Sequence, residues 1–292
     1  MGDRLRRGAA LATYGLASAL SRIDPDRYED VEVFCAFLGY TRSGHSFIGA
    51  MLDAHPEMAI AMEADALRMI ELGADRRVLF KALTLRSKFV ARVLGSRWSG
   101  YSYAVPGGHQ GRWERLRVLG DKQGRRTLWR IHENPELLDR LRDTVACDLR
   151  LLHVIRNPFD TIATMHNRHR SVQASSESTG TTRVVVPDRL QKKIDWFFEQ
   201  CRWMKQARAT LELDLLDVYQ EDYLQEPVAG LARIIDFLGL TAPDDYLQRC
   251  ASVTLREPRK SRFSFEWPAG FIADVKSRMA EFEVLARYDF DT

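Results

Sequence analysis

Residues 31–56 read VEVFCAFLGYTRSGHSFIGAMLDAHP, and this stretch decides the fold of the chain. Its first eight residues are mostly apolar, which predicts a buried β-strand over 31–38. A short loop at 39–44 has a glycine at each end, and we expect a helix to begin at His45 and Ser46. A strand that leads through such a loop into a helix builds an anion site, because free N–H groups and the positive end of the helix dipole face the loop.

The side chains of the loop support a phosphate-like ligand. Arg42 supplies a fixed positive charge, and Ser43 and Ser46 supply hydroxyl donors. Gly44 lets the backbone approach the anion closely. The loop nearly spells the Walker A motif G-x-x-x-x-G-K-[ST], but His45 stands where the lysine should be. A P-loop kinase is therefore an alternative that this substitution weakens, and a plain glycine turn before a core helix is another.

A second anion site is predicted where another buried strand ends. Residues 148–155 read DLRLLHVI, as a central parallel strand should, and Arg156-Asn157-Pro158 follows directly. A charged residue at this position faces the ligand crevice of an open α/β sheet, and arginine can grip a phosphate with two parallel hydrogen bonds. Thr164, on the helix that follows, could reach the same phosphate. A P-loop NTPase would instead need an acidic residue at such a strand tip to hold Mg²⁺.

Strands alternate with helices along the whole chain, which predicts an α/β fold with a central parallel sheet flanked by helices. We expect a single domain over residues 1–292. Residues 1–28 suggest an amphipathic helix that docks on the body, or else contacts a membrane surface through residues 3–22. Residues 171–186 have a turn-rich composition and are expected to be mobile. Residues 95–111, rich in glycine, serine and aromatics, suggest a lid over an acceptor or an aromatic-pinned surface loop.

Composition limits the classes of partner. The chain of 292 residues is 45% hydrophobic and has a formal net charge of +3, too mild and too dispersed for a nucleic-acid binder. Its four cysteines lie far apart without a C-x-x-C pair, so neither zinc nor a disulfide framework is expected. No stretch reaches the roughly 18 apolar residues that a membrane span requires.

These motifs, taken in order, resemble one family. Residues 41–47, TRSGHSF, are similar to the P-[KR]-S-G-T-T-[WFL] loop of sulfotransferases that use 3′-phosphoadenosine 5′-phosphosulfate (PAPS). Residues 51–56, MLDAHP, resemble the segment that follows this loop in the carbohydrate and tyrosylprotein branches. Residues 156–164 resemble the family's 3′-phosphate site, R-[ND]-P-x-D-x(3)-[ST]. Thr41 replaces the usual proline and His45 the first threonine.

The resemblance implies an activity and a location. The chain would be an enzyme with a P-loop-like fold that moves a sulfuryl group from PAPS to a hydroxyl of a carbohydrate, lipid-linked or other small acceptor. Transfer would be in line and would need no metal. A cytoplasmic location is expected because PAPS is made in the cytosol. A non-catalytic nucleotide-binding scaffold with the same fold is the alternative.

The resemblance also implies catalytic roles for particular residues. Glu63 would be the base that removes the acceptor proton, with Asp65 and then His109 as substitutes. Lys122, in Gly120-Asp121-Lys122, would join Arg42 in stabilising charge on the leaving phosphate.

Donor-binding roles follow in the same way. Asp160 is expected to cap its helix rather than touch ligand. Phe47 and Trp267 could stack on adenine, although a core position is the plainer expectation for both. The residues predicted to bind the donor are Arg42, Ser43, Gly44, His45, Ser46, Phe47, Arg156, Thr164, Arg259 and Lys260.

Overall fold

A computed structural model of the chain describes residues 14–20, 28–98, 100–167, 185–255 and 257–291. Most of the predicted N-terminal helix and nearly all of the loop at 171–186 lie outside these residues. Residues 14–20 are helical, and Ala17 is buried in the hydrophobic core. Within the described residues, no helix is long and apolar enough to cross a membrane.

Five parallel strands form the central sheet, in the order β2-β5-β1-β6-β7. Their bounds are β1 Val33–Gly39, β2 Met58–Met62, β5 Val118–Gly124, β6 Asp148–Ile155 and β7 Leu215–Tyr219. The predicted α/β fold with a flanked parallel sheet is thereby confirmed. A separate two-stranded hairpin, β3 (Arg97–Trp98) and β4 (Tyr101–Ser102), lies within the segment that was predicted as a loop.

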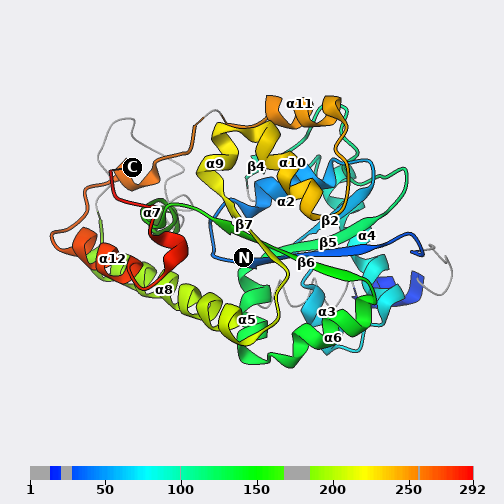
Figure 1. Ribbon diagram of the computed structural model, residues 1–292, viewed down its shortest axis with the longest axis horizontal. Coiled ribbons are helices and arrows are strands. Elements are labelled where there is room, and N and C mark those ends of the chain that lie inside the picture. Colours follow the sequence, from blue (N-terminus) through cyan, green and yellow to red (C-terminus); the bar gives the residue numbers. More distant parts are fainter. Residues whose placement is uncertain (1–13, 21–27, 99, 168–184, 256, 292) are drawn as a thin grey trace.

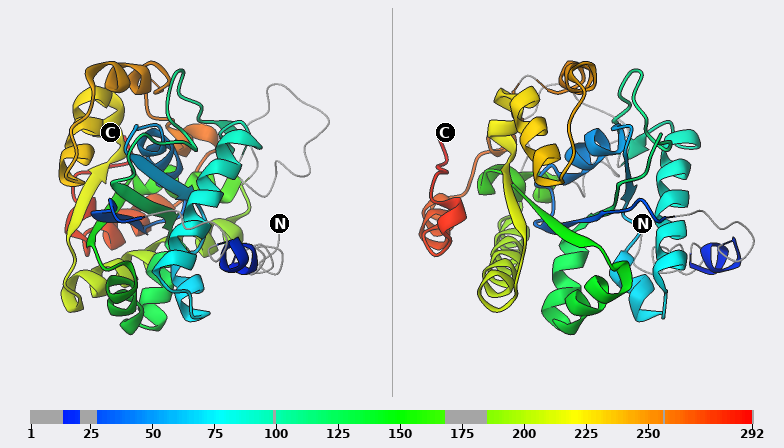
Figure 2. Two further views of the ribbon diagram at one scale, coloured as in Figure 1. Left: turned by 90° about the vertical axis from the view of Figure 1, so that its right-hand side faces the viewer. Right: turned by 45° about the vertical axis from the view of Figure 1, so that its right-hand side comes forward.

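Helices cover both faces of the sheet (Figures 1 and 2). One layer holds α2, α9, α10 and α11, and the other holds α3, α5, α6 and α8. The helices are α2 His45–Asp53, α3 Ala66–Glu71, α4 Arg76–Arg92, α5 Arg125–Glu133, α6 Glu136–Val145, α7 Pro158–Asn167, α8 Pro187–Thr210, α9 Gln220–Gln225, α10 Pro227–Phe237, α11 Asp244–Ser252 and α12 Phe271–Met279, with 3-10 turns η1 Ser261–Ser264 and η2 Glu283–Leu285.

The alternation of side chains along β1 divides the core into two clusters. Phe34, Ala36 and Leu38 point into the cluster under α3, α5 and α8, whereas Cys35 and Phe37 point into the cluster under α2 and α10. All are buried, so β1 is covered on both faces. This explains why its sequence is a nearly continuous apolar run.

The strand order places a crevice at the carboxyl end of β1. From β1 the chain crosses to β2 at one edge of the sheet, whereas β6 and β7 lie on the other side of β1. Ligands of open α/β sheets bind where the strand order reverses in this way. The ends of β1, β5 and β6 therefore meet at the position where the sequence places its anion-binding residues.

One predicted boundary was wrong, and three helices were not predicted. The sequence over residues 268–288 predicts one continuous helix, but α12 ends at Met279 and only the short turn η2 follows. Helices α5, α9 and α11 were not predicted. Helix α5 is strongly basic and buries only Thr127, Leu128 and Ile131, too narrow an apolar stripe to stand out in the sequence.

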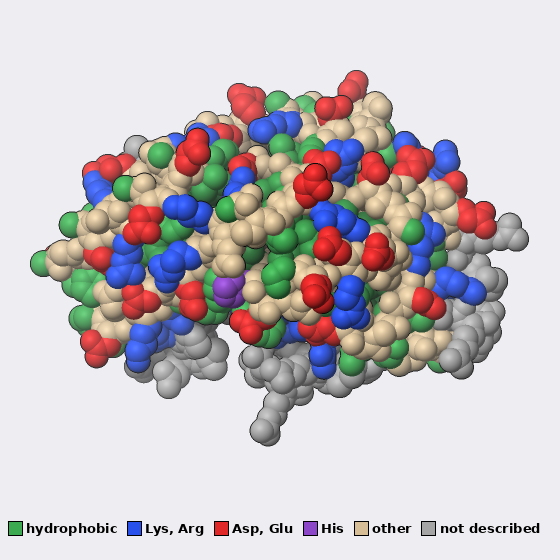
Figure 3. Space-filling model, turned by 60° about the horizontal axis from the view of Figure 1, so that its bottom comes forward, with side chains coloured by type: hydrophobic (Ala, Val, Ile, Leu, Met, Phe, Trp, Pro, Cys, Tyr) green, Lys and Arg blue, Asp and Glu red, His purple; other side chains and the backbone are tan. Residues whose placement is uncertain are grey.

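The surface shows no dominant sign of charge on the face drawn in Figure 3. Basic and acidic side chains are interspersed there. Such a mixture produces no strong single-sign field on that face. All four cysteines are free thiols.

Candidate active site

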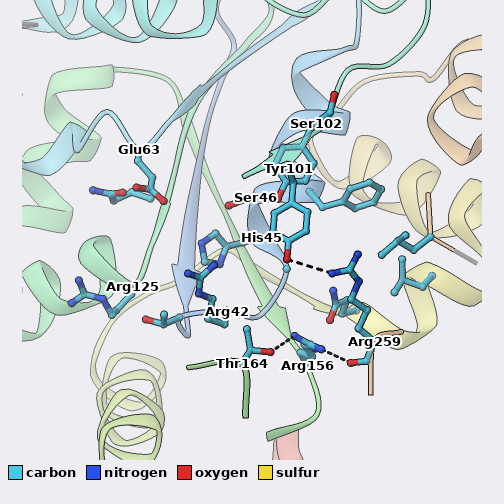
Figure 4. Close-up of a pocket in the computed structure, with 18 of the residues that line it drawn as sticks. Arg42, His45, Ser46, Glu63, Tyr101, Ser102, Arg125, Arg156, Thr164 and Arg259 are labelled. Atoms are coloured by element: carbon cyan, nitrogen blue, oxygen red, sulfur yellow. Dashed lines mark hydrogen bonds between the residues drawn. The ribbon is translucent and has the colours of Figure 1, made fainter. Parts of the chain in front are cut away.

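A cavity of about 390 Å³ opens at the carboxyl ends of β1, β5 and β6. Segments from across the chain meet in it (Figure 4). Its lining contains most of the predicted site residues: Arg42, Gly44, His45, Ser46, Phe47, Glu63, Arg156, Thr164 and Arg259. It also contains Tyr101, Ser102 and Tyr103, from the segment suggested as a lid. The lining residues that were not predicted are Thr41, Gln123, Arg125, Arg126, Gln220, Leu224, Val253 and Leu255.

The loop after β1 has the conformation of an anion cradle. Arg42 has a φ of 71°, and Gly44, the N-cap of α2, has a φ of 99°. A glycine is favoured at the second position, because a φ of 99° is strained for a residue with a side chain. Among the described residues, no side chain caps α2, and the N–H of Phe47 donates to the carbonyl of Gly44. Gly44, His45 and Ser46, at the start of the helix, line the cavity.

Thr41 is tied to helix α8. Its backbone N–H and its hydroxyl both donate to Oε1 of Gln200, at 2.9 and 3.0 Å. Gln200 is fully buried and donates through Nε2 to the carbonyl of Trp196. A proline at position 41 would have neither donor, so this anchor depends on the threonine that departs from the family pattern.

His45 is a neutral residue of the loop. Its Nδ1 lies 3.1 Å from the hydroxyl of Ser43. Burial, with a smaller effect from the nearby Lys122 ammonium, lowers the pKa of His45 to about 3. The imidazole therefore contributes hydrogen bonding rather than charge, unlike the lysine of a Walker A loop.

The end of β6 forms a second corner of the cavity. Arg156 donates through Nη1 to the hydroxyl of Thr164 at 3.3 Å and through Nη2 to the carbonyl of Arg259. The hydroxyl of Ser261 lies 3.2 Å from that of Thr164. The Nε of Arg156 is buried and has no partner within the described part of the chain. The predicted pair of Arg156 and Thr164 is brought together, with the C-terminal segment beside it.

Asp160 has a different role from the predicted cap. The N-terminus of α7 is capped by Asn157, whose Oδ1 accepts from the N–H of Phe159. Asp160 instead accepts from the backbone N–H of Arg262 at 2.9 Å and from its Nη1 at 2.7 Å, and both side chains are almost fully buried. Because the tail packs on α7, this carboxylate anchors the tail beside Arg156.

Glu63 lies across the cavity from Arg156, in a sharp turn after β2 (Figure 4). Glu63 and Asp65 both have positive φ, 52° and 66°. The buried carboxylate of Asp121 holds this turn by accepting from the N–H groups of Ala64 and Ala66. Burial raises the pKa of Asp121 to about 6. Asp121 is therefore a buried residue that holds the turn, and it does not line the cavity.

Lys122 joins Glu63 to the loop. Its Nζ donates to Oε1 of Glu63 at 3.2 Å and to the hydroxyl of Ser46 at 3.0 Å. Burial lowers the pKa of Lys122. The stem of Lys122 packs over Gly49, where a Cβ would lie 2.7 Å from Cγ of the lysine. Although Lys122 is not in the lining, its ammonium contacts two residues that are.

The substitutes for Glu63 are less well placed. Asp65 binds Arg130 through two hydrogen bonds and lies 3.3 Å from Nη1 of Arg126. His109 pairs with Glu114. Neither Asp65 nor His109 lines the cavity. Within the described residues, no group of three or more His, Cys, Asp or Glu side chains could hold a metal ion.

The β3–β4 hairpin covers one side of the cavity. Tyr101, Ser102 and Tyr103 line it, and Nε1 of Trp98 lies 3.4 Å from Oε1 of Glu63. Nη1 of Arg259 lies 3.4 Å from the hydroxyl of Tyr101, so hairpin and tail meet over the cavity. The aromatic residues of segment 95–111 are the sequence feature that suggested a lid here.

The two aromatic residues proposed to stack on adenine differ. Phe47 lines the cavity and also packs against Tyr223 and Tyr103. Trp267 is buried in the core against Phe159. Ser43 is not in the lining, but its hydroxyl contacts Nδ1 of His45, which is. Lys260 is exposed and also lies outside the lining.

Comparison with known proteins identifies a family. The family model described as "Sulfotransferase family" matches residues 36–244. No curated protein matches the sequence. Among solved structures, sulfotransferase STF9 from Mycobacterium avium is similar, with a TM-score of 0.51 and 12% identity over 94% of this chain and 83% of that one. Sulfotransferase STF1 from Mycobacterium tuberculosis H37Rv has a TM-score of 0.49 and 15% identity, over 95% of this chain and 84% of that one. A sulfotransferase from Alicyclobacillus acidocaldarius has a TM-score of 0.44 and 15% identity, over 89% of this chain and 97% of that one.

Proposed function

The chain belongs to the family of PAPS-dependent sulfotransferases, and from this premise we propose how one domain, residues 1–292, binds the donor and transfers its sulfuryl group. The phosphosulfate lies in the loop after β1. Arg42 and the N–H groups at the start of α2 bind its oxygens, and Ser46 adds a hydroxyl donor. Ser43, Gly44, His45 and Phe47 complete the donor site on this side.

The 3′-phosphate lies at the end of β6. Arg156 and Thr164 bind it, and the buried Nε of Arg156 lacks a partner among the described residues that a phosphate oxygen would supply. Arg259 closes the site from the tail, with Lys260 as an outer positive charge. The two anions of one nucleotide would thus occupy the two anion sites of one cavity.

Transfer follows an in-line path. Glu63 takes the proton of the acceptor hydroxyl while that oxygen attacks sulfur, and the bond from sulfur to the bridging phosphate oxygen breaks. The products are a sulfate ester and 3′,5′-bisphosphoadenosine. Lys122 and Arg42 stabilise the negative charge that develops on the bridging oxygen, without the need for a metal. Lys122 is held for this role by its contacts with Ser46 and Glu63.

The acceptor is a hydroxyl compound: a carbohydrate, a lipid-linked alcohol or another small molecule. It enters on the Glu63 side, under the β3–β4 hairpin, which acts as its lid. A cytoplasmic location follows from the site of PAPS synthesis. Contact with a membrane would involve residues 3–22, most of which lie outside the described residues.

One observation carries this proposal: Arg42, Arg156 and Glu63, from three separate segments, line the same cavity. The test is calorimetric titration with 3′,5′-bisphosphoadenosine, without metal, and with ATP plus Mg²⁺. We expect micromolar binding of the bisphosphate, lost in Arg156→Ala. Arg150→Ala, on the opposite end of the same strand, is the matched control and should bind normally. Preference for ATP–Mg²⁺ would overturn the proposal in favour of a kinase.

A further inference from the structure

One acceptor atom of the cavity lining lacks a hydrogen-bond donor. Oε1 of Gln220 is buried and has no partner among the described residues, and Gln220 lines the cavity. Such an atom destabilises the free protein, because it has lost its hydrogen bonds to water. The buried Nε of Arg156 is a donor that a phosphate oxygen can satisfy. Oε1 of Gln220 is an acceptor, so it needs a different part of the bound molecule.

The backbone places Gln220 between the two predicted anion sites. Gln220 directly follows β7, and Arg156 directly follows β6. Tyr219 and Ile155, the last residues of these strands, are paired, so Gln220 and Arg156 begin at the same level of the sheet edge. The carboxamide of Gln220 also lies beside Gly44, where a Cβ would be 2.6 Å from its Nε2. In the proposed donor complex, the nucleoside joins these two sites and passes Gln220.

Apolar side chains of the lining adjoin Gln220. Leu224 follows one turn later on α9, so both side chains lie on the same face of this helix, and both line the cavity. Phe47 lines it too and packs edge-on against Tyr223 of α9, with ring centroids 5.9 Å apart. Val253 adds a further apolar side chain. A flat heterocycle suits such a wall better than a ribose does, so the base is the part of the nucleoside that lies there.

We propose that Gln220 recognises the adenine of the donor, with Oε1 accepting a hydrogen bond from the exocyclic amine. This deepens the proposed function and rests on it. Outside its phosphates, the nucleotide has two donor groups, the amine and the ribose 2′-hydroxyl, and only the amine belongs to the base. A carboxamide suits adenine because it can donate to N7 while it accepts from the amine. Guanine carries a carbonyl oxygen in place of the amine, so the site selects against it.

The test compares three nucleotides by calorimetric titration: 3′,5′-bisphosphoadenosine, the 3′,5′-bisphosphate of purine riboside, which lacks the amine, and 2′-deoxyadenosine 3′,5′-bisphosphate, which lacks the hydroxyl. We expect the wild type to bind the nucleotide without the amine about tenfold more weakly than 3′,5′-bisphosphoadenosine. Gln220→Met keeps the length of the side chain but has no acceptor oxygen. It should weaken 3′,5′-bisphosphoadenosine about tenfold and leave the nucleotide without the amine within twofold.

Two controls separate recognition from a structural role. Gln225→Met, at the other end of α9, changes an exposed residue outside the lining and should bind all three nucleotides as the wild type does. The free Gln220→Met protein should unfold at no lower temperature than the wild type, because the substitution removes an unpaired buried atom. An equal loss of affinity for all three nucleotides, with a lower unfolding temperature, would overturn the proposal in favour of a structural role.

The outcomes also separate this proposal from the function on which it rests. Failure of the wild type to bind 3′,5′-bisphosphoadenosine overturns the proposed function itself. Normal binding, with the preference for the amine unchanged in Gln220→Met, overturns the role of Gln220 and leaves sulfuryl transfer intact. If Gln220→Met instead abolished only the effect of the 2′-hydroxyl, Gln220 would bind the ribose and the assignment to the base would be wrong.

Discussion

At the scale of single residues, the site depends on side chains that hold others in place. Asp121 forms the turn that presents Glu63, and Lys122 links Glu63 to Ser46. Gln200 anchors the loop at Thr41. Loss of such a residue changes geometry without removing a group that touches substrate, so binding and turnover should respond differently.

The assignment of Glu63 as base predicts a selective loss of turnover. Glu63→Gln keeps the shape and the contact with Lys122 but cannot take a proton, so kcat should fall about 10²- to 10⁴-fold. Affinity for 3′,5′-bisphosphoadenosine should stay within twofold. His109→Gln, at the last substitute base, serves as control and should retain its activity. A Glu63→Gln enzyme with normal turnover would refute the assignment.

The anchor at Thr41 predicts a coupling between two residues. Gln200→Leu removes the acceptor of both donors of the half-buried Thr41, at a cost of about 1 kcal/mol for each lost hydrogen bond, and should weaken bisphosphate binding by loosening the loop. Thr41→Val should weaken it less, because the backbone N–H remains. Isothermal titration of both single variants and the double variant measures the coupling.

The expected result is that Thr41→Val costs little once Gln200 is already leucine. Additive losses would show that the two residues act independently. Unchanged binding in Gln200→Leu would remove the anchor from the donor site altogether.

At the scale of elements, patterns with a strong period were predicted well. The strand at 148–155 and the helix after the glycine loop have the expected bounds within a residue or two. Helix α5 was missed, since its surface is basic and its contacts with α8 and β1 are tertiary. The cap of α7 was assigned to Asp160, because the sequence cannot show that Arg262, about a hundred residues later, pairs with it.

The junction of α2, β2 and α4 predicts a pH-dependent stability. Asp53, at the end of α2, accepts from the N–H of Ile60 and the hydroxyl of Ser87. Burial raises the pKa of Asp53 to about 7. At a pH between the ordinary pKa of aspartate and about 7, Asp53 is protonated in the folded state but ionised in the unfolded state. The free energy of unfolding therefore falls as the pH rises from about 4 to 7.

Asp53→Asn should remove this part of the slope, because asparagine keeps both acceptor contacts and does not titrate. Urea unfolding of wild type and variant at pH 4.5, 5.5 and 6.5 measures it. The free energy of unfolding should decline more steeply with pH in the wild type. Parallel profiles would show that Asp53 stays ionised in the folded state.

At the scale of the whole molecule, the cavity is assembled from segments that are distant in sequence. The loop after β1, the end of β6, the hairpin and the tail meet there, and the contact between Arg259 and Tyr101 joins the last two over the opening. If the nucleotide binds as proposed, the hairpin and the tail cover it. Substitutions in the hairpin or the tail should therefore change the dissociation rate of the nucleotide as much as substitutions at the phosphate sites do.

Arg259→Ala predicts faster release of 3′,5′-bisphosphoadenosine. It removes a charge from the lining and the link to Tyr101, and the dissociation rate should rise about tenfold, equivalent to about 1.4 kcal/mol. Lys260→Ala is the matched control, since Lys260 lies outside the lining and should have a smaller effect. Stopped-flow displacement measures both rates. If Lys260→Ala raised the dissociation rate more than Arg259→Ala, Lys260 rather than Arg259 would be the residue that retains the nucleotide.

The sequence by itself determined the family and the parallel sheet, and it predicted two anion sites. These features are encoded locally, in an apolar strand followed by glycines or by an arginine, and strand order then places both strand ends at one edge. The sequence ranked Glu63 before Asp65 and His109, and the tertiary structure places only Glu63 of these three in the lining of the cavity. It also brought Arg125 and Arg126 beside Glu63 and paired Arg262 with Asp160. These outcomes depend on contacts between segments up to a hundred residues apart, and no local pattern records them.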